Sequence, residues 1–126
     1  MATRSTIAFQ DNTGRVHQVY CHWDGYLSNN GNILLGNYTD INLIGEMVAG
    51  GDMSSLGHVP DDCEYYKDKG EDDYVPRVFT SYDDYIEHGQ YEEYNYLYKD
   101  EQWYVHCGLT DDSFELLTES LIALEG

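Results

Sequence analysis

Residues 91–107 read YEEYNYLYKDEQWYVHC, and this stretch decides the fold that the sequence predicts. Two β-prone runs, residues 91–98 and 103–107, flank a polar turn at residues 99–102, which is the pattern of an antiparallel hairpin. Successive side chains on a strand point to opposite faces, so pairing Tyr98 with Trp103 divides the hairpin into two faces. We expect the core face to carry Tyr94, Tyr96, Tyr98, Trp103, Val105 and Cys107, and the other face Asn95, Leu97, Tyr104 and His106.

A second hairpin is predicted near the start of the chain. Residues 6–10 and 16–21 are β-prone, and the polar stretch between them ends in Gly14, where the turn needs a left-handed residue. Helical spacing of apolar residues then predicts two helices. The first covers residues 28–38, with Ser28 or Asn29 as N-cap; the second covers residues 41–48, with Thr39 as N-cap and Gly50-Gly51 at its end.

The rest of the chain alternates between irregular and regular patterns. Residues 52–76 hold glycines and prolines among charged residues without a sustained period, which predicts a long loop, acidic over residues 61–76, with one short strand near Tyr65 and Tyr66. A brief strand at residues 77–80 and a short helix capped by Ser81 and closed by Gly89 follow. A terminal helix is predicted after Asp111 or Asp112, with one apolar stripe of Phe114, Leu117, Leu121 and Leu124.

These elements predict one acidic α+β domain over residues 1–126. The sheet is expected to be mainly antiparallel and built from two hairpins, with helices packed on one face. A chain of 126 residues is long enough to bury a proper core. High net charge can indicate disorder, but 14% of the residues are aromatic, which favours a folded domain.

Acidity is the strongest indication of function. The formal net charge is -18, from 24 acidic and six basic residues, and fourteen of the acids lie between Asp61 and Glu101. Such a surface argues against direct binding to nucleic acid or to anionic membranes, because phosphate groups are bound by Lys and Arg. The expected partner is instead a basic protein or complex that itself binds nucleic acid, and no cofactor is expected.

The candidate partner-binding residues combine this acidic stretch with its tyrosines. Tyrosine supplies large contact area at low entropic cost, and carboxylates beside it suit an Arg-rich surface through ion pairs and cation-π contacts. We expect Tyr65, Tyr66, Tyr74, Tyr82 and Tyr85 to be exposed; a solvated acidic face is the alternative interpretation. The full set is Asp61, Asp62, Glu64, Tyr65, Tyr66, Asp68, Glu71, Asp72, Asp73, Tyr74, Tyr82, Asp83, Asp84, Tyr85, Glu87, Glu92, Glu93, Asp100 and Glu101.

Two segments resemble a known family. Residues 3–8, TRSTIA, and residues 19–26, VYCHWDGY, are similar to the opening of a family of small, uncharacterised bacteriophage proteins. The likeness continues in the Leu-rich segment around residues 33–38, the SSLG stretch at residues 54–57 and the WYV of the second hairpin. The resemblance implies a phage accessory protein acting in the cytoplasm of a bacterial host, and it implies no activity for any residue.

Cysteine and histidine provide the main alternative. The adjacent pairs Cys21-His22 and His106-Cys107, with His17 or Cys63, contain enough ligands for zinc if the hairpins bring them together, although the usual short ligand spacings are absent. Three cysteines are an odd number for a secreted disulfide framework and favour reduced thiols. Common catalytic motifs are missing, and the acidic pairs lack the spacing of a calcium loop.

The sequence therefore predicts a non-enzymatic phage inhibitor. Its target would be a nucleic-acid-handling defence protein of the host, such as a restriction or CRISPR component, blocked by an acidic surface that mimics nucleic acid. The alternatives are a small metal-dependent phage enzyme or accessory protein that uses the Cys/His residues, and a virion or assembly component. No run of about 20 apolar residues is present, so no membrane association is expected.

Overall fold

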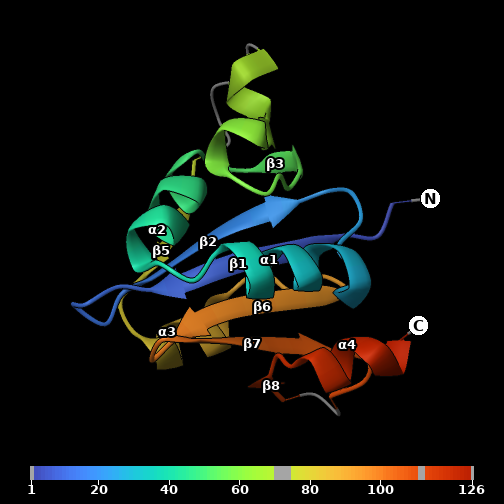
Figure 1. The fold of residues 1–126 in the computed structure, drawn as a ribbon. Helices are drawn as coiled ribbons and strands as arrows, with labels where there is room; N and C mark the ends of the chain where they lie inside the picture. Colours follow the sequence, from blue (N-terminus) through green and yellow to red (C-terminus); the bar gives the residue numbers. More distant parts are fainter. Residues whose placement is uncertain (1, 70–74, 111–112, 126) are drawn as a thin grey trace.

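The computed structural model of the chain describes residues 2–69, 75–110 and 113–125 (Figure 1). The strands are β1 (Ser5–Gln10), β2 (Val16–Cys21), β3 (Met53–Ser55), β4 (Glu64–Tyr65), β5 (Arg77–Phe79), β6 (Tyr94–Lys99), β7 (Gln102–Cys107) and β8 (Glu115–Leu116). The helices are α1 (Asn32–Asn37), α2 (Ile41–Ala49), α3 (Tyr82–His88) and α4 (Glu119–Glu125). Shorter helical turns are η1 (Leu27–Gly31), η2 (Pro60–Asp62) and η3 (Tyr66–Lys69).

One mixed, mostly antiparallel sheet contains both predicted hairpins. The strand order is β4-β3-β2-β1-β6-β7-β8, and β5 pairs with β2 beside this path. Within the hairpins, Ser5 pairs with Cys21, and Tyr98 pairs with Trp103 as expected. The α+β class is therefore confirmed, but the sheet is more than two hairpins: β1 and β6 join them in parallel, and β2 and β3 also run parallel.

Both faces of the sheet are covered, which corrects the expectation that helices pack on one face. The predicted core face of the second hairpin is confirmed, since Tyr96, Tyr98, Trp103, Val105 and Cys107 lie in one buried cluster with η1, α1, α2 and α4. On the opposite face, α3 contributes Tyr85 to a second cluster, which consists of Ala8, Val16, Phe79, Tyr85 and Leu97. Leu97 and Asn95 are buried there because the face predicted to lie away from the core is covered as well.

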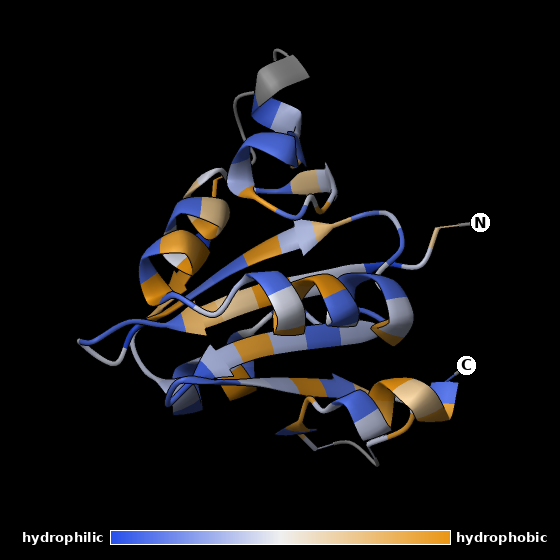
Figure 2. Ribbon diagram, in the orientation of Figure 1, coloured by the Kyte–Doolittle hydropathy of each residue, from blue (hydrophilic) through white to orange (hydrophobic). Residues whose placement is uncertain are grey.

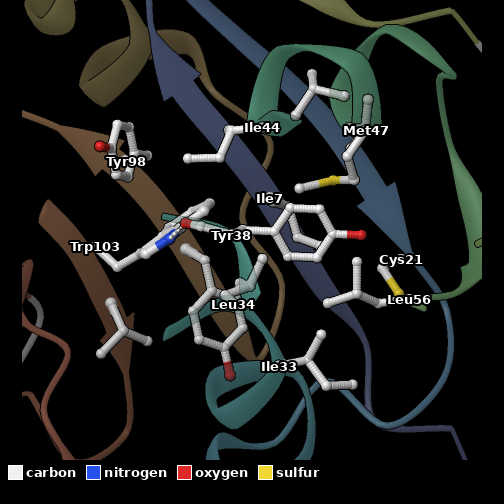
Figure 3. Close-up of a cluster of buried hydrophobic side chains, with 14 of the residues drawn as sticks. Ile7, Cys21, Ile33, Leu34, Tyr38, Ile44, Met47, Leu56, Tyr98 and Trp103 are labelled. Carbon is white, nitrogen blue, oxygen red and sulfur yellow. Dashed lines mark hydrogen bonds between the residues drawn. The ribbon is translucent and has the colours of Figure 1, made fainter. Parts of the chain in front are cut away.

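Polar groups fix the larger core. The indole Nε1 of Trp103 donates to the carbonyl oxygen of Tyr38 at 2.9 Å, which joins β7 to the end of α1 (Figure 3). The Tyr38 hydroxyl in turn donates to the carbonyl oxygen of Gly57 at 2.8 Å. Both rings are buried, so these bonds satisfy polar atoms that would otherwise be costly to remove from water.

The N-terminus of the first helical segment is stabilised from the other end of the chain. Neither Ser28 nor Asn29 is its cap, contrary to the expectation. The carboxylate of Glu125, in α4, accepts hydrogen bonds from the backbone N–H groups of Leu27 and Ser28, each at 3.0 Å, and from the hydroxyl of Tyr94 at 2.8 Å. Sequence-local capping rules miss this contact because its partners lie 98 and 97 residues apart.

The other caps follow the local rules more closely. In α2, Asp40 rather than Thr39 is the N-cap, and its side chain accepts from the Asn42 N–H. Ser81 caps α3 as predicted, accepting from the Asp84 N–H, and the helix ends at Gly89. At Gly14, the predicted left-handed turn position has a φ of 91°.

The terminal helix is shorter than predicted. Asp111 and Asp112, its expected caps, lie outside the described residues. Residues 115–116 instead form β8, which pairs with β7 and ends the sheet on that side, and α4 begins only at Glu119. The expected stripe is divided: Leu117 is buried in the main core, Phe114 packs on the opposite face, and Leu124 is 74% exposed. Pairing with β7 satisfies backbone groups at a sheet edge, which helical spacing does not reveal.

Residues 52–76 are also more ordered than expected. Strands β3 and β4 extend the sheet beyond β2. The buried carboxylate of Asp52 accepts from the Tyr20 N–H at 2.8 Å and from the Arg77 guanidinium at 3.1 Å, which ties the start of this segment to two other strands. The strand near Tyr65 is confirmed, whereas the expectation of a single long loop is wrong for the described part.

Two glycines in the helical layer provide a matched test of the packing. Gly50 has ordinary helical angles, but a Cβ atom there would overlap the buried ring of Tyr65. Gly36 in α1 has no atom within 4 Å of its Cβ position. We expect Gly50→Ala to lower the free energy of unfolding by about 1–3 kcal/mol through overpacking. Gly36→Ala should raise it by about 0.5–1 kcal/mol through helix propensity. Urea unfolding of both variants measures these free energies. Equal changes in the two variants would contradict the close packing of Gly50 against the Tyr65 ring.

Glu125→Gln tests the long-range cap. Burial disfavours the charged form, but the N–H groups of Ser28 and Leu27 and the Tyr94 hydroxyl outweigh it and lower the pKa of Glu125 below its ordinary 4.5. A lowered folded-state pKa contributes stability above pH 4.5, which is lost as the pH falls through the folded value. We expect Glu125→Gln to cost about 1 kcal/mol at pH 7, with a smaller difference from the parent at pH 3. Glu46→Gln, an exposed site with the same charge change, is the control, and an equal loss there would refute the cap.

Candidate functional site

The predicted partner-binding acids lie at the protein surface wherever the structure describes them. Asp84 and Glu92 are half-buried, and the others are exposed: Asp61, Asp62, Glu64, Asp83, Glu87, Glu93, Asp100 and Glu101. Glu71, Asp72, Asp73 and Tyr74 lie outside the described residues, as does the side chain of Asp68. Among described ion pairs, only Asp84 with His88 and Asp100 with Lys99 involve this set. Most of these carboxylates therefore contribute an uncompensated negative charge.

These acids do not form one group. Asp61, Asp62 and Glu64 lie at the η2 and β4 side of the sheet, and Asp83, Asp84 and Glu87 lie on α3 behind it (Figure 1). Glu92 and Glu93 precede β6, whereas Asp100 and Glu101 follow it. The length of β6 separates these last two pairs by about 20 Å. The structure thus distributes the 61–101 acids over four places.

One of these places gains acids from elsewhere in the chain. An open hollow of about 670 Å³ is lined by Gln10, Asp11, Asn12, Thr39, Asp40, Ile41, Tyr98, Asp100 and Glu101. The β1–β2 turn, the start of α2 and the β6–β7 turn meet there, because β1 and β6 are parallel and end on the same side of the sheet (Figure 1). We call this the acidic hollow. The two turns also hold hydrophilic residues (Figure 2).

Backbone conformation fixes the carboxylates of the acidic hollow. Asp100 and Glu101 form a two-residue turn with positive φ values of 53° and 64°, the conformation that matches the twist of a hairpin. Asp11 accepts from the His17 ring at 2.7 Å and from the N–H groups of Thr13 and Arg15. The His17 contact, followed by that of Thr13, holds the pKa of Asp11 far below its ordinary value. Asp11 is therefore charged throughout the physiological pH range.

Asp11 and Asp40 were missed as candidate site residues by the sequence analysis. Their segments look like ordinary scaffold, since residues 1–60 contain only five acids. What brings Asp11 and Asp40 to the acidic hollow is the parallel pairing of β1 with β6, and no short-range sequence pattern predicts that pairing. Only the register of that pair places Asp11 and Asp100 at one end of the sheet.

Two of the tyrosines expected to be exposed are buried. Tyr85 is fully buried, and burial raises its pKa well above the ordinary value. Tyr65 is 6% exposed, and its hydroxyl donates to the carbonyl oxygen of Met47. Each ring packs between a helix and the sheet. The acidic neighbours of these tyrosines in the sequence therefore did not indicate that the rings are exposed. Tyr66 and Tyr82 are half-buried.

A second hollow lies on the face covered by α3. Its volume is about 460 Å³, and it is lined by Tyr82, Ile86, Tyr91, His106, Ser113 and Phe114. Ile86 and Tyr91 are 38% and 39% exposed. We call it the aromatic pocket. It combines residues from α3, β7 and the segment before β8, and sequence analysis did not group them because Phe114 was expected in a helix packed on the other face.

The two Cys/His pairs lie apart. In the sheet register, Cys21, Ser5, Tyr94 and Cys107 form one row across four strands. Three strand spacings separate the two cysteines by about 14 Å, too far for them to share one zinc ion. Within the described residues, no group of three or more Cys, His, Asp or Glu side chains is arranged to hold a metal ion. This geometry does not support a joint Cys/His site.

The thiols are also poorly suited to nucleophilic chemistry. Burial raises the pKa of Cys21 to about 11 and also raises that of Cys107. The Cys63 sulfur lies 3.7 Å from the Tyr38 hydroxyl and accepts from the Gly57 N–H. Since the thiolate is the reactive form, these cysteines behave as core residues.

Comparisons with known proteins add no assignment. No family model matches the chain, no curated protein matches it significantly, and no solved structure does. None of the helices in the described residues has the length and apolar character that crossing a bilayer requires. The resemblance to small phage proteins therefore stays a prediction.

Thiol accessibility tests the structural role of the cysteines. All three are buried, with exposed fractions of 0% for Cys21, 6% for Cys63 and 4% for Cys107. We expect a thiol-specific disulfide reagent at pH 8 to react with none of them within minutes, and with all three after unfolding in guanidinium. Rapid native-state labelling of one thiol, located by mass spectrometry, would instead identify a reactive cysteine.

Proposed function

We propose that the protein is a non-enzymatic phage inhibitor that binds a nucleic-acid-handling defence protein of the bacterial host and occupies its basic groove. The observation that carries the proposal is the net charge of -18, together with carboxylates that the fold leaves at the surface. A restriction or CRISPR component is the target class that the phage resemblance favours. Such proteins bind nucleic acid through Lys and Arg side chains. An acidic domain can bind the same side chains in place of the nucleic acid.

Among the described residues, ion pairs within the chain neutralise few of these surface charges. Of the six Lys and Arg residues in the chain, Arg77 pairs with the buried Asp52, and Lys99 pairs with Asp100. The acids that stabilise the fold, such as Asp52 and Glu125, are different residues from the proposed partner-binding set. The electrostatic field of these unpaired surface carboxylates speeds association with a basic partner, and this effect weakens as salt is added.

The acidic hollow is the best candidate for the central contact. Asp11, Asp40, Asp100 and Glu101 come from three segments and face one depression. DNA presents one charge per about 1.7 Å of its axis, so several carboxylates within one depression approach its charge density better than isolated pairs do. The other acidic groups, including Glu92 and Glu93, would add long-range attraction.

Charge-neutralising variants test the proposal. Tagged protein is used to capture host proteins at 50 mM salt, and each purified candidate is then assayed for nucleic-acid binding with and without the protein. We expect a basic nucleic-acid-binding protein whose nucleic-acid binding is lost in the complex. Asp40→Asn/Asp100→Asn/Glu101→Gln should weaken the complex about tenfold, consistent with a few tenths to 1 kcal/mol per exposed pair.

The control removes the same number of charges elsewhere. Asp24→Asn/Glu46→Gln/Glu119→Gln changes three exposed acids outside the acidic hollow. Asn tolerates the left-handed conformation of Asp24, where φ is 58°. Equal weakening by both triple variants would refute a specific surface. A complex that is insensitive to salt, or a captured protein that still binds its nucleic acid normally, would refute mimicry.

A further inference from the structure

We propose that the aromatic pocket is an anchor site for an arginine side chain of the partner. The inference rests on the proposed function for the identity of that partner as a basic protein. It goes further by naming a recognised side chain and a second binding site, outside the acidic hollow. The geometry, the surrounding charge and the position of Lys99 each support it.

Four aromatic rings pack against one another at the aromatic pocket, and three of them line it. The ring centroids are 6.1 Å apart for Tyr85 and Tyr91, 5.7 Å for Tyr91 and His106, 5.5 Å for His106 and Phe114, and 6.0 Å for Phe114 and Tyr85. Tyr85 is fully buried, and it packs beneath Tyr91 and Phe114, two of the four aromatic residues that line the pocket. Aromatic faces carry the negative end of the ring quadrupole, which attracts a cation.

The walls of the pocket are fixed before any ligand binds. The hydroxyl of Tyr91 donates to the carbonyl oxygen of Ile86 at 2.9 Å, near the end of α3. His106 belongs to β7 and pairs with the buried Asn95 of β6. Tyr82 and Ile86 are four residues apart on α3 and so present one face of the helix to the pocket. Such a preformed site binds without the entropic cost of ordering its walls.

Two exposed carboxylates of α3 are next to pocket-lining residues of that helix and favour a positive ligand. Asp83 and Glu87 are exposed, and each follows a pocket residue on α3, so they lie on the adjacent, outward flank of that helix. A neutral apolar side chain would gain nothing from these charges. The guanidinium group of arginine is planar and weakly hydrated, and it stacks on aromatic rings while its edges bind carboxylates.

A cation within the chain already contacts one of the pocket-lining rings. The Nζ of Lys99 lies 5.1 Å from the centroid of the Tyr82 ring and 2.9 Å from the Asp100 carboxylate. Tyr82 lines the aromatic pocket and Asp100 lines the acidic hollow. Lys99 therefore contacts one residue of each site, at the end of β6, although the acidic hollow lies toward α2 and the aromatic pocket lies on the α3 face of the sheet.

Binding of a model arginine to the purified protein alone tests the site without the partner. The probe is N-acetyl-arginine methylamide, and the neutral control is N-acetyl-norleucine methylamide, each followed in aromatic ¹H–¹³C NMR spectra. We expect saturable shifts of the Tyr82, Tyr91, His106 and Phe114 signals with millimolar affinity for the arginine probe, and at least fivefold weaker binding of norleucine. Equal binding of both probes, or shifts spread over all the acidic groups, would overturn the proposal.

Two variants separate the ring and charge contributions. Phe114→Leu removes a ring but keeps apolar volume, and Asp83→Asn/Glu87→Gln removes the flanking charge. Each should weaken arginine binding at least threefold, whereas Tyr20→Leu and Asp61→Asn/Glu64→Gln, remote from the pocket, should leave it unchanged. Equal losses in the controls would refute the assignment.

Ile86→Arg is a surface change that keeps the test informative if Phe114→Leu fails to fold. Ile86 is 38% exposed, and the new side chain should occupy the pocket and abolish probe binding. Undiminished probe binding in this variant would overturn the site. In the capture experiment, Ile86→Arg should weaken a complex that the parent protein forms. Probe binding without any captured partner would refute the proposed function while leaving the arginine site in place.

Discussion

The parallel pairing of β1 with β6 is the constraint on which the rest of the structure depends. It joins the two hairpins in one sheet, from Ser5 opposite Tyr94 to Phe9 opposite Tyr98. Two buried hydrogen bonds support this register: the Thr6 hydroxyl donates to the Asn95 side chain at 2.8 Å, and the Tyr96 hydroxyl donates to the Gly25 carbonyl oxygen at 2.6 Å. A shift by one residue would exchange the two faces of a strand and break both bonds.

Because the sheet is joined in this way, it needs cover on both faces. The face toward α1, α2 and α4 carries the larger core, and α3 covers the other (Figure 1). The second layer is small, and its aromatic residues are only partly covered at its margin, where Tyr91 is 39% exposed. The aromatic pocket is therefore a consequence of packing one short helix against a wide sheet.

The acidic residues fall into two classes with different physical roles. Asp52 and Glu125 accept buried or half-buried hydrogen bonds from backbone N–H groups and hold distant segments together. Asp83, Glu87 and Glu93 are exposed and form no ion pair with a described basic residue. Like-charge repulsion makes the second class a cost to stability, which favours a role in binding.

The sequence by itself determined the net charge and the local elements. The two hairpins, with the Tyr98–Trp103 register, and helix α3, with its Ser81 cap, follow from contacts within a few residues. Local patterns also gave wrong expectations where distant residues pack together. Tyr85 was expected to be exposed but is buried between α3 and the sheet, and Phe114 was expected in a helix but lies before β8. Only the tertiary structure decided that Glu125 caps the first helical segment and that Asp11 and Asp100 share one hollow. Those contacts join residues about ninety or more positions apart, and no short-range periodicity encodes them.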